Sequence, residues 1–180
     1  MLIDRLPSWL RFKRDVRETG QIARSFPLDL VDGIDPSIGF RLSELDIGDV
    51  QNLATANPVE LFVETPYSFG QIIDWMAQAQ LLAEIGPQRF VQARASGIRD
   101  IMTLICLGST STGRVLLKPI LSAADESDDA LEARVTGIGE KLHVRHLRHW
   151  SNLLLHAIHA PVASPPVVET SNVAVLKATS

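Results

Sequence analysis

The chain contains a single cysteine, Cys106, so it cannot form a disulfide within itself, and its cysteine usage does not indicate an oxidising compartment. Cys106 lies in the apolar run 101–107, which predicts a buried core thiol and not the cationic, partly exposed setting of a reactive one. No run approaches the roughly 18 apolar residues that a membrane-spanning helix needs, and the first residues do not form a signal-peptide pattern. These absences predict an intracellular, cytoplasmic protein.

The chain also lacks the residue sets of the common enzyme classes. The acidic run 125–129 predicts a solvated loop or helix start, where carboxylates favour the helix dipole. The polar run 108–113 has no Gly-Lys-Ser/Thr ending and no strand before it, so it predicts a turn that caps the next helix and not a phosphate-binding loop. We therefore expect no enzyme activity, no catalytic residue, no cofactor and no small-molecule substrate.

What the chain does contain is enough apolar sequence for a substantial core. Its 180 residues are 46% hydrophobic and 21% charged, which is close to an ordinary globular domain. The net charge of −4 and the isoelectric point near 5.7 argue against a protein coated with a polyanion. Any contact with nucleic acid would therefore need a local basic surface.

Composition divides the chain into three parts. Residues 1–39 form a basic-apolar N-terminal arm and a connector rich in Pro and Gly, 40–159 form a helical domain, and 160–180 form a flexible tail. In the arm, Trp9 and Phe12 stand among arginines, but Pro7 and the charges that continue onto the apolar face argue against a membrane anchor. We expect the arm to dock on a partner or on the protein's own core, with at most peripheral membrane contact.

Two stretches of the helical domain, 45–53 and 96–104, share one pattern. In each, an Ile is followed two residues later by Asp, then by an aliphatic residue, and then by a Leu three positions further on. An Asp at a helix N-cap accepts hydrogen bonds from free backbone N–H groups, and the aliphatic residue and the Leu lie one turn apart on the packed face. Each copy therefore predicts two helices joined by a tight turn, with Asp46 or Gly97 at the turn.

Between the two copies, residues 69–82 have the periodicity of an amphipathic helix. Their apolar positions recur every three or four residues, so we expect one face to pack on the core, with Trp75 beside that face. Thr65 followed by Pro66 is typical of a helix cap and first helical residue, which predicts that this helix starts there.

Residues 40–107 resemble a module of uncharacterised bacterial proteins that is similar to tandem helix-hairpin-helix repeats of the SAM-like kind. The resemblance rests on the runs 49–58, 61–67, 74–75, 78–81 and 97–99. It implies an all-α fold of tandem helix-hairpin-helix-like (SAM-like) units, which here would be followed by a long C-terminal helix. Such units bind DNA in some proteins and mediate protein association in others, so the resemblance implies a fold more than a function. The turns at 46–48 and 97–99 depart from the Gly-apolar-Gly sequence that lets a phosphate approach.

The closest match to such a phosphate-binding turn is Gly137-Ile138-Gly139. Glycines there would let a phosphate reach backbone N–H groups at a helix start, with a nearby cation to neutralise it. Glu140 beside the turn argues against this reading, as does the alternative that the glycines only punctuate a helix.

All five histidines fall within 143–159, in a segment with the pattern of a long helix. Val144, Leu147, Leu154, Leu155 and Ile158 gather on one side of that helix, and the arginines and most histidines spread over the other. Because arginines flank the histidines and no Cys or acidic pair completes a ligand set, we expect no metal site. The pattern favours a solvated face that becomes more positive as pH falls.

Two functions fit these observations. The first is a non-catalytic protein-association or scaffold module, with a protein partner or a second copy of the chain, whose contact surface is Trp9, Phe12, Arg145 and His149. The alternative is sequence-independent DNA binding through Gly137, Gly139, Lys141, Arg145 and Arg148. The acidic net charge and the first two turns favour association, whereas the Gly-Ile-Gly sequence favours DNA.

Overall fold

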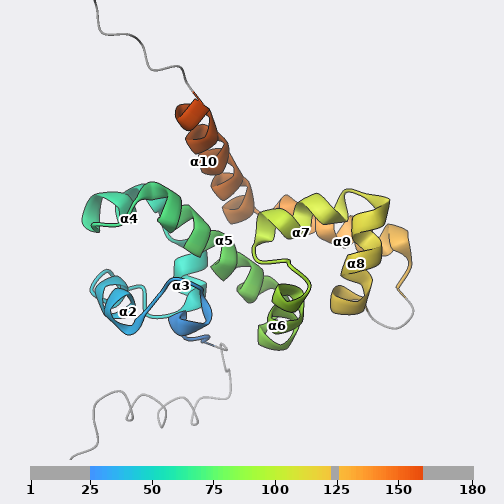
Figure 1. The fold of residues 1–180 in the computed structure, drawn as a ribbon, viewed down its shortest axis with the longest axis horizontal. Coiled ribbons are helices and arrows are strands. Elements are labelled where there is room, and N and C mark those ends of the chain that lie inside the picture. The colour runs from blue at the N-terminus through green and yellow to red at the C-terminus, as the bar shows by residue number, and fades with distance from the viewer. Residues whose placement is uncertain (1–24, 123–125, 160–180) are drawn as a thin grey trace, which may run out of the picture.

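The computed structural model describes residues 25–122 and 126–159, the last three of these by backbone alone, and every regular element in this part of the chain is helical (Figure 1). The all-α prediction is therefore confirmed. No helix among the described residues combines the length and the apolar character needed to cross a membrane. The elements are η1 (Leu28–Leu30), α2 (Pro36–Ser43), α3 (Val50–Thr55), α4 (Pro58–Glu64), α5 (Phe69–Ile85), α6 (Pro87–Ala95), α7 (Ile101–Gly108), α8 (Ser111–Leu121), α9 (Asp128–Gly139) and α10 (Leu142–His159).

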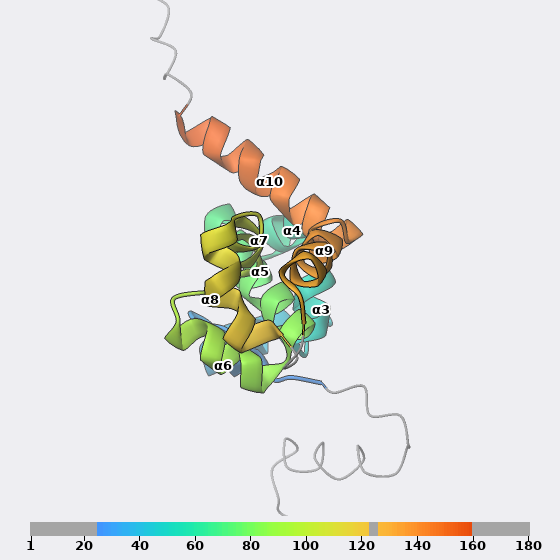
Figure 2. The ribbon, with the colours of Figure 1, turned by 90° about the vertical axis from the view of Figure 1, so that its right-hand side faces the viewer.

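Helix α5 is the central element, and it packs against α3, α4, α6, α7 and α10 (Figure 1, Figure 2). From Ile72 to Leu82 every side chain is buried except the half-buried Asp74. The prediction that one face of this helix packs on the core was therefore wrong, because neighbouring helices surround it. Trp75 does pack in the core, as predicted, with 2% of its surface exposed.

The start of α5 also differs from the prediction. Thr65 ends α4 with an extended backbone, and its hydroxyl donates to the carbonyl of Leu61. The cap of α5 is Ser68, which accepts the backbone N–H of Gln71 while the Gln71 side chain accepts the N–H of Ser68. This reciprocal capping box satisfies two helix-terminal donors, which Thr65 and Pro66 do not do, so the helix begins three residues after Pro66, at Phe69.

The two predicted turns are confirmed, and they have the same backbone geometry. Asp46 and Gly97 take up positive φ angles, +60° and +82°. The next residue then donates its N–H back into the preceding helix, from Ile47 to Leu42 at 3.0 Å and from Ile98 to Ala93 at 2.8 Å. This is the hydrogen bond that closes a helix at a left-handed residue.

The predicted N-caps follow these turns. Asp49 accepts the backbone N–H of Asn52 at 2.8 Å, and Asp100 accepts that of Thr103 at 2.9 Å. The aliphatic and Leu positions of both copies are fully buried. The repeated sequence pattern therefore corresponds to a repeated local structure.

Two other expectations are corrected by the packing. The segment 27–39, expected as a connector, also contributes to the core, because Leu28, Val31 and Ile34 are buried. Cys106, expected in the core, is exposed. Helix α7 turns Ile101 and Leu104 inward, and this places Cys106 on its outer side.

Helix α10 projects from the body of the molecule in both views (Figure 1, Figure 2). Its first half packs against α5 and α9 through the buried Val144 and Leu147. Its second half projects outward, and Leu155, which was predicted on the packed side, is 52% exposed.

Candidate binding groove

A groove of about 740 Å³ lies where α10 crosses the junction of α3 and α4, with α5 beneath it. We call it the α10 groove. Its walls come from two segments that are far apart in the sequence and are brought together on α5. The lining residues are Ala54, Thr55, Ala56, Asn57, Pro58, Met76, Gln80, Leu142, His143, His146, Leu147, His149 and Trp150.

The α10 groove is continuous with an aromatic surface. Trp150 in the groove contacts Phe69 edge to face, with ring centroids 5.8 Å apart, and Phe69 contacts Phe62 in the same way at 5.7 Å. Phe62 is 49% exposed, and its neighbour Val63 on α4 is 72% exposed. Exposed apolar surface next to a concave, mostly apolar groove is typical of an interaction site.

Gln80 gives the groove an unsatisfied hydrogen-bond acceptor. Its amide nitrogen donates to the backbone carbonyls of Ala54 at 2.9 Å and His143 at 3.2 Å. Because both partners can only accept, these bonds fix which end of the amide is nitrogen. Oxygen Oε1 is buried and accepts no hydrogen bond from any residue that the structure describes. A buried acceptor without a donor costs roughly 1–3 kcal/mol. Because Oε1 has almost no exposed surface, a donor in the groove would gain this bond when the Gln80 side chain shifts toward it.

Three histidines of α10 line the same groove. His143 is half-buried, and burial lowers the pKa of its imidazole, with a smaller lowering from the nearby charge of Lys141 and a small opposing effect from Glu84. His146 and His149 are exposed on the following turns of the helix. None of the lining residues carries a full charge at neutral pH apart from any protonated imidazole.

A second, smaller hollow of about 260 Å³ lies on the other side of the α3–α4 junction. It shares Thr55, Ala56 and Asn57 with the α10 groove and has two carboxylates, Asp46 and Glu60, in its lining. We call it the acidic hollow. The mostly apolar α10 groove and the acidic hollow therefore adjoin each other at residues 55–57.

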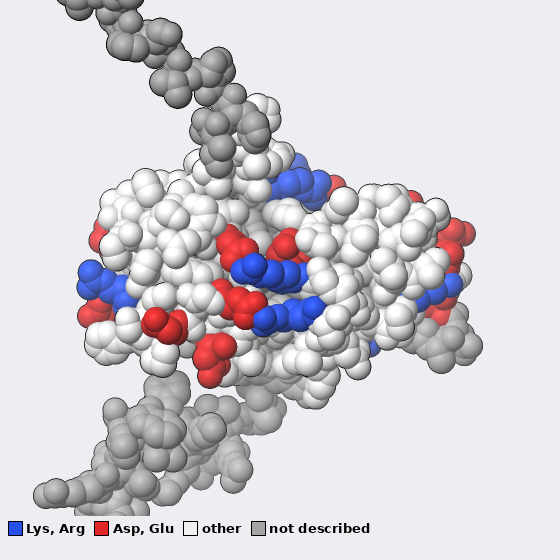
Figure 3. All heavy atoms as spheres, in the orientation of Figure 1, with Lys and Arg blue, Asp and Glu red and all other residues white. Residues whose placement is uncertain are grey.

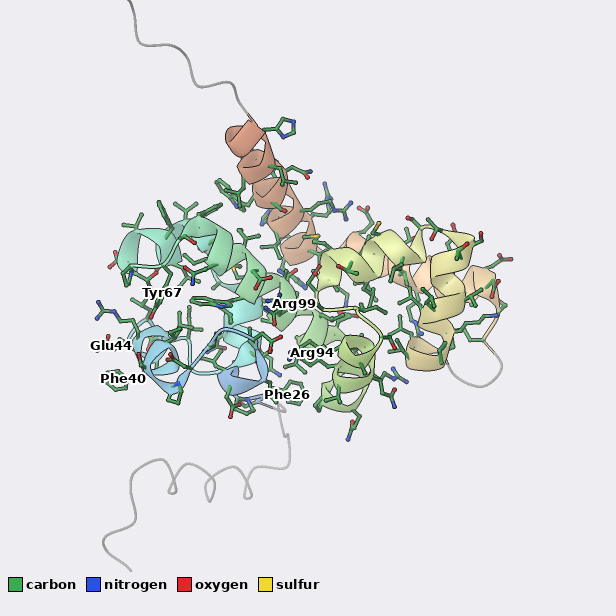
Figure 4. The ribbon with its side chains drawn as sticks, viewed as in Figure 1. Phe26, Phe40, Glu44, Tyr67, Arg94 and Arg99 are labelled. Atoms are coloured by element: carbon green, nitrogen blue, oxygen red, sulfur yellow. The ribbon has the colours of Figure 1, made fainter. Side chains whose placement is uncertain are left out.

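A cluster of charged side chains occupies the other side of α5, and Figure 3 shows it in the middle of that face of the molecule. Arg94 pairs with Asp32, and Arg99 pairs with Asp74 at 2.8 Å. Both arginines, labelled in Figure 4, reach from α6 and the following turn toward these carboxylates. The buried Gln78 completes the cluster, and we call the five residues the α5 clamp.

Every polar atom of the Gln78 amide has a partner in this clamp. Its oxygen accepts the backbone N–H of Asp32 at 2.9 Å, and its nitrogen donates to Asp74 at 2.8 Å and to the carbonyl of Asp32. The opposite charges balance one another within the clamp. This arrangement holds the segment before α2, the helix α5 and the α6–α7 turn together.

The residues predicted to bind DNA meet at the α9–α10 junction. Gly137 and Gly139 both belong to the last turn of α9, so the connection to α10 consists of Glu140 and Lys141. As helical residues, the two glycines use their N–H groups inside the helix ladder. An exposed loop of free glycine N–H groups, on which the phosphate prediction depends, is therefore not found at these two positions.

The three predicted cations at this junction have partners within the protein. Lys141 Nζ lies 2.6 Å from a Glu84 carboxylate oxygen, and Arg148 donates to the carbonyl of Gly139 at 2.6 Å. Arg145 is exposed, with its Nε 4.0 Å from Glu140. Two of the three cations are thus engaged by close internal hydrogen bonds.

Of the residues predicted for protein association, His149 lines the α10 groove and Arg145 lies exposed on α10. Trp9 and Phe12 lie outside the described residues.

Sequence reasoning missed Gln80, although two glutamines inside the apolar pattern of residues 69–82 were a signal that polar contacts cross the core there. Among the residues described, no three or more His, Cys, Asp or Glu are placed to hold a metal ion.

No protein-family model, curated protein or solved structure matches this chain.

Proposed function

We propose that this protein is a non-catalytic association module and that the α10 groove is where it binds a segment of a protein. The observation that carries the proposal is the buried, unpartnered Oε1 of Gln80 in a groove with mostly apolar walls. Buried polar groups in native proteins are nearly always paired with protein groups or ordered water, so an exception needs an explanation, and the one proposed here is a donor from a bound segment. An apolar segment with one hydrogen-bond donor fits that site.

The surroundings of the groove support a protein segment as the occupant. The edge-to-face series Phe62, Phe69 and Trp150 extends the apolar surface from the groove onto α4. Binding energy in protein interfaces concentrates in a few aromatic and apolar side chains that fill pockets, with a wider surface excluding water around them. The groove would take such an anchoring side chain, and the exposed face of α4 would provide the surrounding contact.

The tandem helix-hairpin-helix-like (SAM-like) arrangement is part of the same proposal. The matched turns at Asp46 and Gly97, with matched Asp caps after them, support two related units. In this arrangement α5 joins the two units, and α10 closes one side of the first to form the groove.

Sequence-independent DNA binding remains the alternative prediction, but the geometry gives it less support. Phosphate contact through Lys141 or Arg148 would have to break the Lys141–Glu84 pair or the Arg148 bond to Gly139, which leaves Arg145 as the exposed cation. Loss of these internal contacts would offset part of the gain from each phosphate.

The test is selection of binders from a displayed library of short random peptides, with the full chain as bait. We expect enriched peptides to combine aromatic or aliphatic residues with a side-chain donor, and to lose at least tenfold in affinity for the variant Thr55→Phe, which fills the groove from an exposed position. The matched control is Val115→Phe, on the exposed surface of α8 and outside the groove.

Two results would contradict the proposal. One is peptide binding that Thr55→Phe and Val115→Phe leave equally unchanged. The other is an absence of peptide binding together with binding of a labelled DNA duplex that weakens steeply as salt rises, which would favour phosphate contacts.

A further inference from the structure

We infer that residues 1–24 of the same chain occupy the α10 groove, with the indole N–H of Trp9 donating to Oε1 of Gln80. This inference rests on the proposed function, because it names the segment that the groove binds when no other protein is present. Four properties of the molecule support it: the chemistry of the donor, the charge of the segment, the place where it joins the body, and its length.

Trp9 has the chemistry that the site requires. An indole has one N–H donor and no acceptor, so it can satisfy a lone acceptor without introducing a new unpaired group. Its large apolar ring suits a groove lined by Met76, Leu147 and Trp150. Leu10 and Phe12, which follow in the sequence, supply apolar side chains for the adjoining aromatic surface.

The charge of the segment complements the surface beside the groove. Residues 1–24 contain six Lys or Arg and three Asp or Glu. Asp46 and Glu60 line the acidic hollow next to the α10 groove. Cations flanking Trp9, such as Arg11 and Lys13, would therefore face carboxylates while the apolar residues enter the groove.

The segment joins the body at the helix that leads to the groove. The Ser25 hydroxyl donates to Asp49 at 2.9 Å, and the Phe26 carbonyl accepts the N–H of Val50 at 2.9 Å, which anchors this point at the N-terminus of α3. The groove begins at the other end of α3, at residues 54–56. Helix α3 has 6 residues, so the two ends are about 9 Å apart at 1.5 Å per residue.

The chain between Trp9 and Ser25 is long enough to make this connection. An extended chain covers roughly 3.3 Å per residue, which gives these residues a reach of about 50 Å. A short tether also holds the segment at an effective concentration of roughly millimolar, which favours the chain's own segment over that of a second copy.

The experiment measures the indole N–H groups of the full chain by NMR after incorporation of ¹⁵N-labelled tryptophan. The chain has three tryptophans, and the Trp9 signal is assigned by its loss in Trp9→Phe. We expect the Trp9 indole proton to exchange with water at least tenfold more slowly than in a free peptide of residues 1–24. Gln80→Leu should restore fast exchange, whereas the matched control Gln92→Leu, at an exposed position on α6, should not.

Thr55→Phe provides a second test that does not alter Gln80. It should also release the Trp9 indole, and the unchanged signal of the buried Trp75 shows that the fold is retained. Fast exchange of Trp9 in the unaltered chain would overturn the inference. Slow exchange that is lost on dilution would overturn it too, because the groove would then bind the segment of a second copy.

Failure of this inference can be told apart from failure of the proposed function. If Trp9 is free but selected peptides still depend on Thr55, the groove binds another protein and only the occupant is wrong. If Trp9 is bound as inferred, selected peptides should bind the Trp9→Ala chain about tenfold more tightly than the unaltered chain. Equal affinity for the two chains would contradict occupation of the groove by the arm.

Discussion

Gln78 and Gln80 are buried glutamines of the same helix, and they are used in opposite ways. Gln78 is 0% exposed and Gln80 is 2% exposed, and they lie two residues apart, so they face different sides of α5. The amide of Gln78 has a partner for its oxygen and for its nitrogen. Among the described residues, the amide of Gln80 has partners for its nitrogen alone, and its oxygen has none.

The surroundings of the two glutamines also differ, since one lies among paired charges and the other beside a mostly apolar groove. Gln78 belongs to the α5 clamp, where arginines and aspartates from four segments of the chain neutralise one another. Gln80 belongs to a groove whose described lining contains no lysine, arginine, aspartate or glutamate. One side of α5 is thus complete within the described residues, and the other lacks a donor. The comparison teaches that the clamp serves the fold and that the groove is the better candidate for binding.

The largest expected effect on stability comes from truncating Trp75, a core side chain of α5, the helix that carries both glutamines. Trp75→Ala should lower the free energy of unfolding by about 2–5 kcal/mol, because it opens a cavity in the centre of α5's packing. Urea denaturation followed by circular dichroism measures this change. Val91→Ala, at an exposed position of α6, is the control and should change stability by less than about 0.5 kcal/mol. A fully tolerated Trp75→Ala would show that α5 is not packed as described.

The next largest effect compares the loss of stability when each of the two glutamines is replaced by leucine. Gln78→Leu should cost about 1–3 kcal/mol, because it leaves the partly buried backbone N–H and carbonyl of Asp32 without Gln78 and removes one partner of Asp74, which keeps its pair with Arg99. Gln80→Leu should cost less, about 0–2 kcal/mol, because it removes an unpaired oxygen together with the two bonds of its nitrogen. Equal losses in the two variants, measured by the same denaturation experiment, would remove the distinction between the two sides of α5.

A smaller effect concerns the pH dependence of the groove. Burial lowers the pKa of His143 in the folded protein, so the unfolded chain binds a proton there at a higher pH than the folded protein does. The free energy of unfolding should therefore fall as pH drops through the ordinary histidine pKa of about 6.5 and below it. His143→Gln should flatten this dependence relative to the matched exposed variant His156→Gln. A dependence that both variants retain equally would assign it to other groups.

The smallest effect is expected at the surface of the clamp. Arg99→Gln should lower the free energy of unfolding by about 0.3–1 kcal/mol, since the arginine is 52% exposed and water screens its attraction to Asp74. The loss should shrink further at high salt. A loss several times larger than this, unaffected by salt, would mean that Arg99 is held by more than exposed ion pairs.

Local features of the fold were predictable from the sequence because they depend on neighbours along the chain. Asp49 and Asp100 cap helices through residues three positions away, and the turns at Asp46 and Gly97 follow from the same short patterns. The capping box of Ser68 and Gln71 was equally local, and the stronger-looking Thr65-Pro66 signal obscured it.

The features that were not predictable depend on packing between distant segments. In the short apolar helix α7, periodicity could not decide which side faces inward, and so the exposure of Cys106 was missed. Helix α5 is surrounded because α3, α6 and α10 all pack on it, and no window of its own sequence contains that information. The α10 groove joins residues 54–58 to residues 142–150, so it exists only once the chain has folded.

The most direct test of the binding role of the groove is the carbonyl carbon signal of the Gln80 side chain, read by NMR in the full-length Trp9→Phe chain as a selected peptide is added. We predict that the Gln80 Cδ resonance shifts as its oxygen gains a donor, and that the Gln78 Cδ resonance, already bonded in the α5 clamp, stays in place. A peptide that binds without moving the Gln80 signal, or that moves both signals equally, would contradict the assignment of the groove as the binding site.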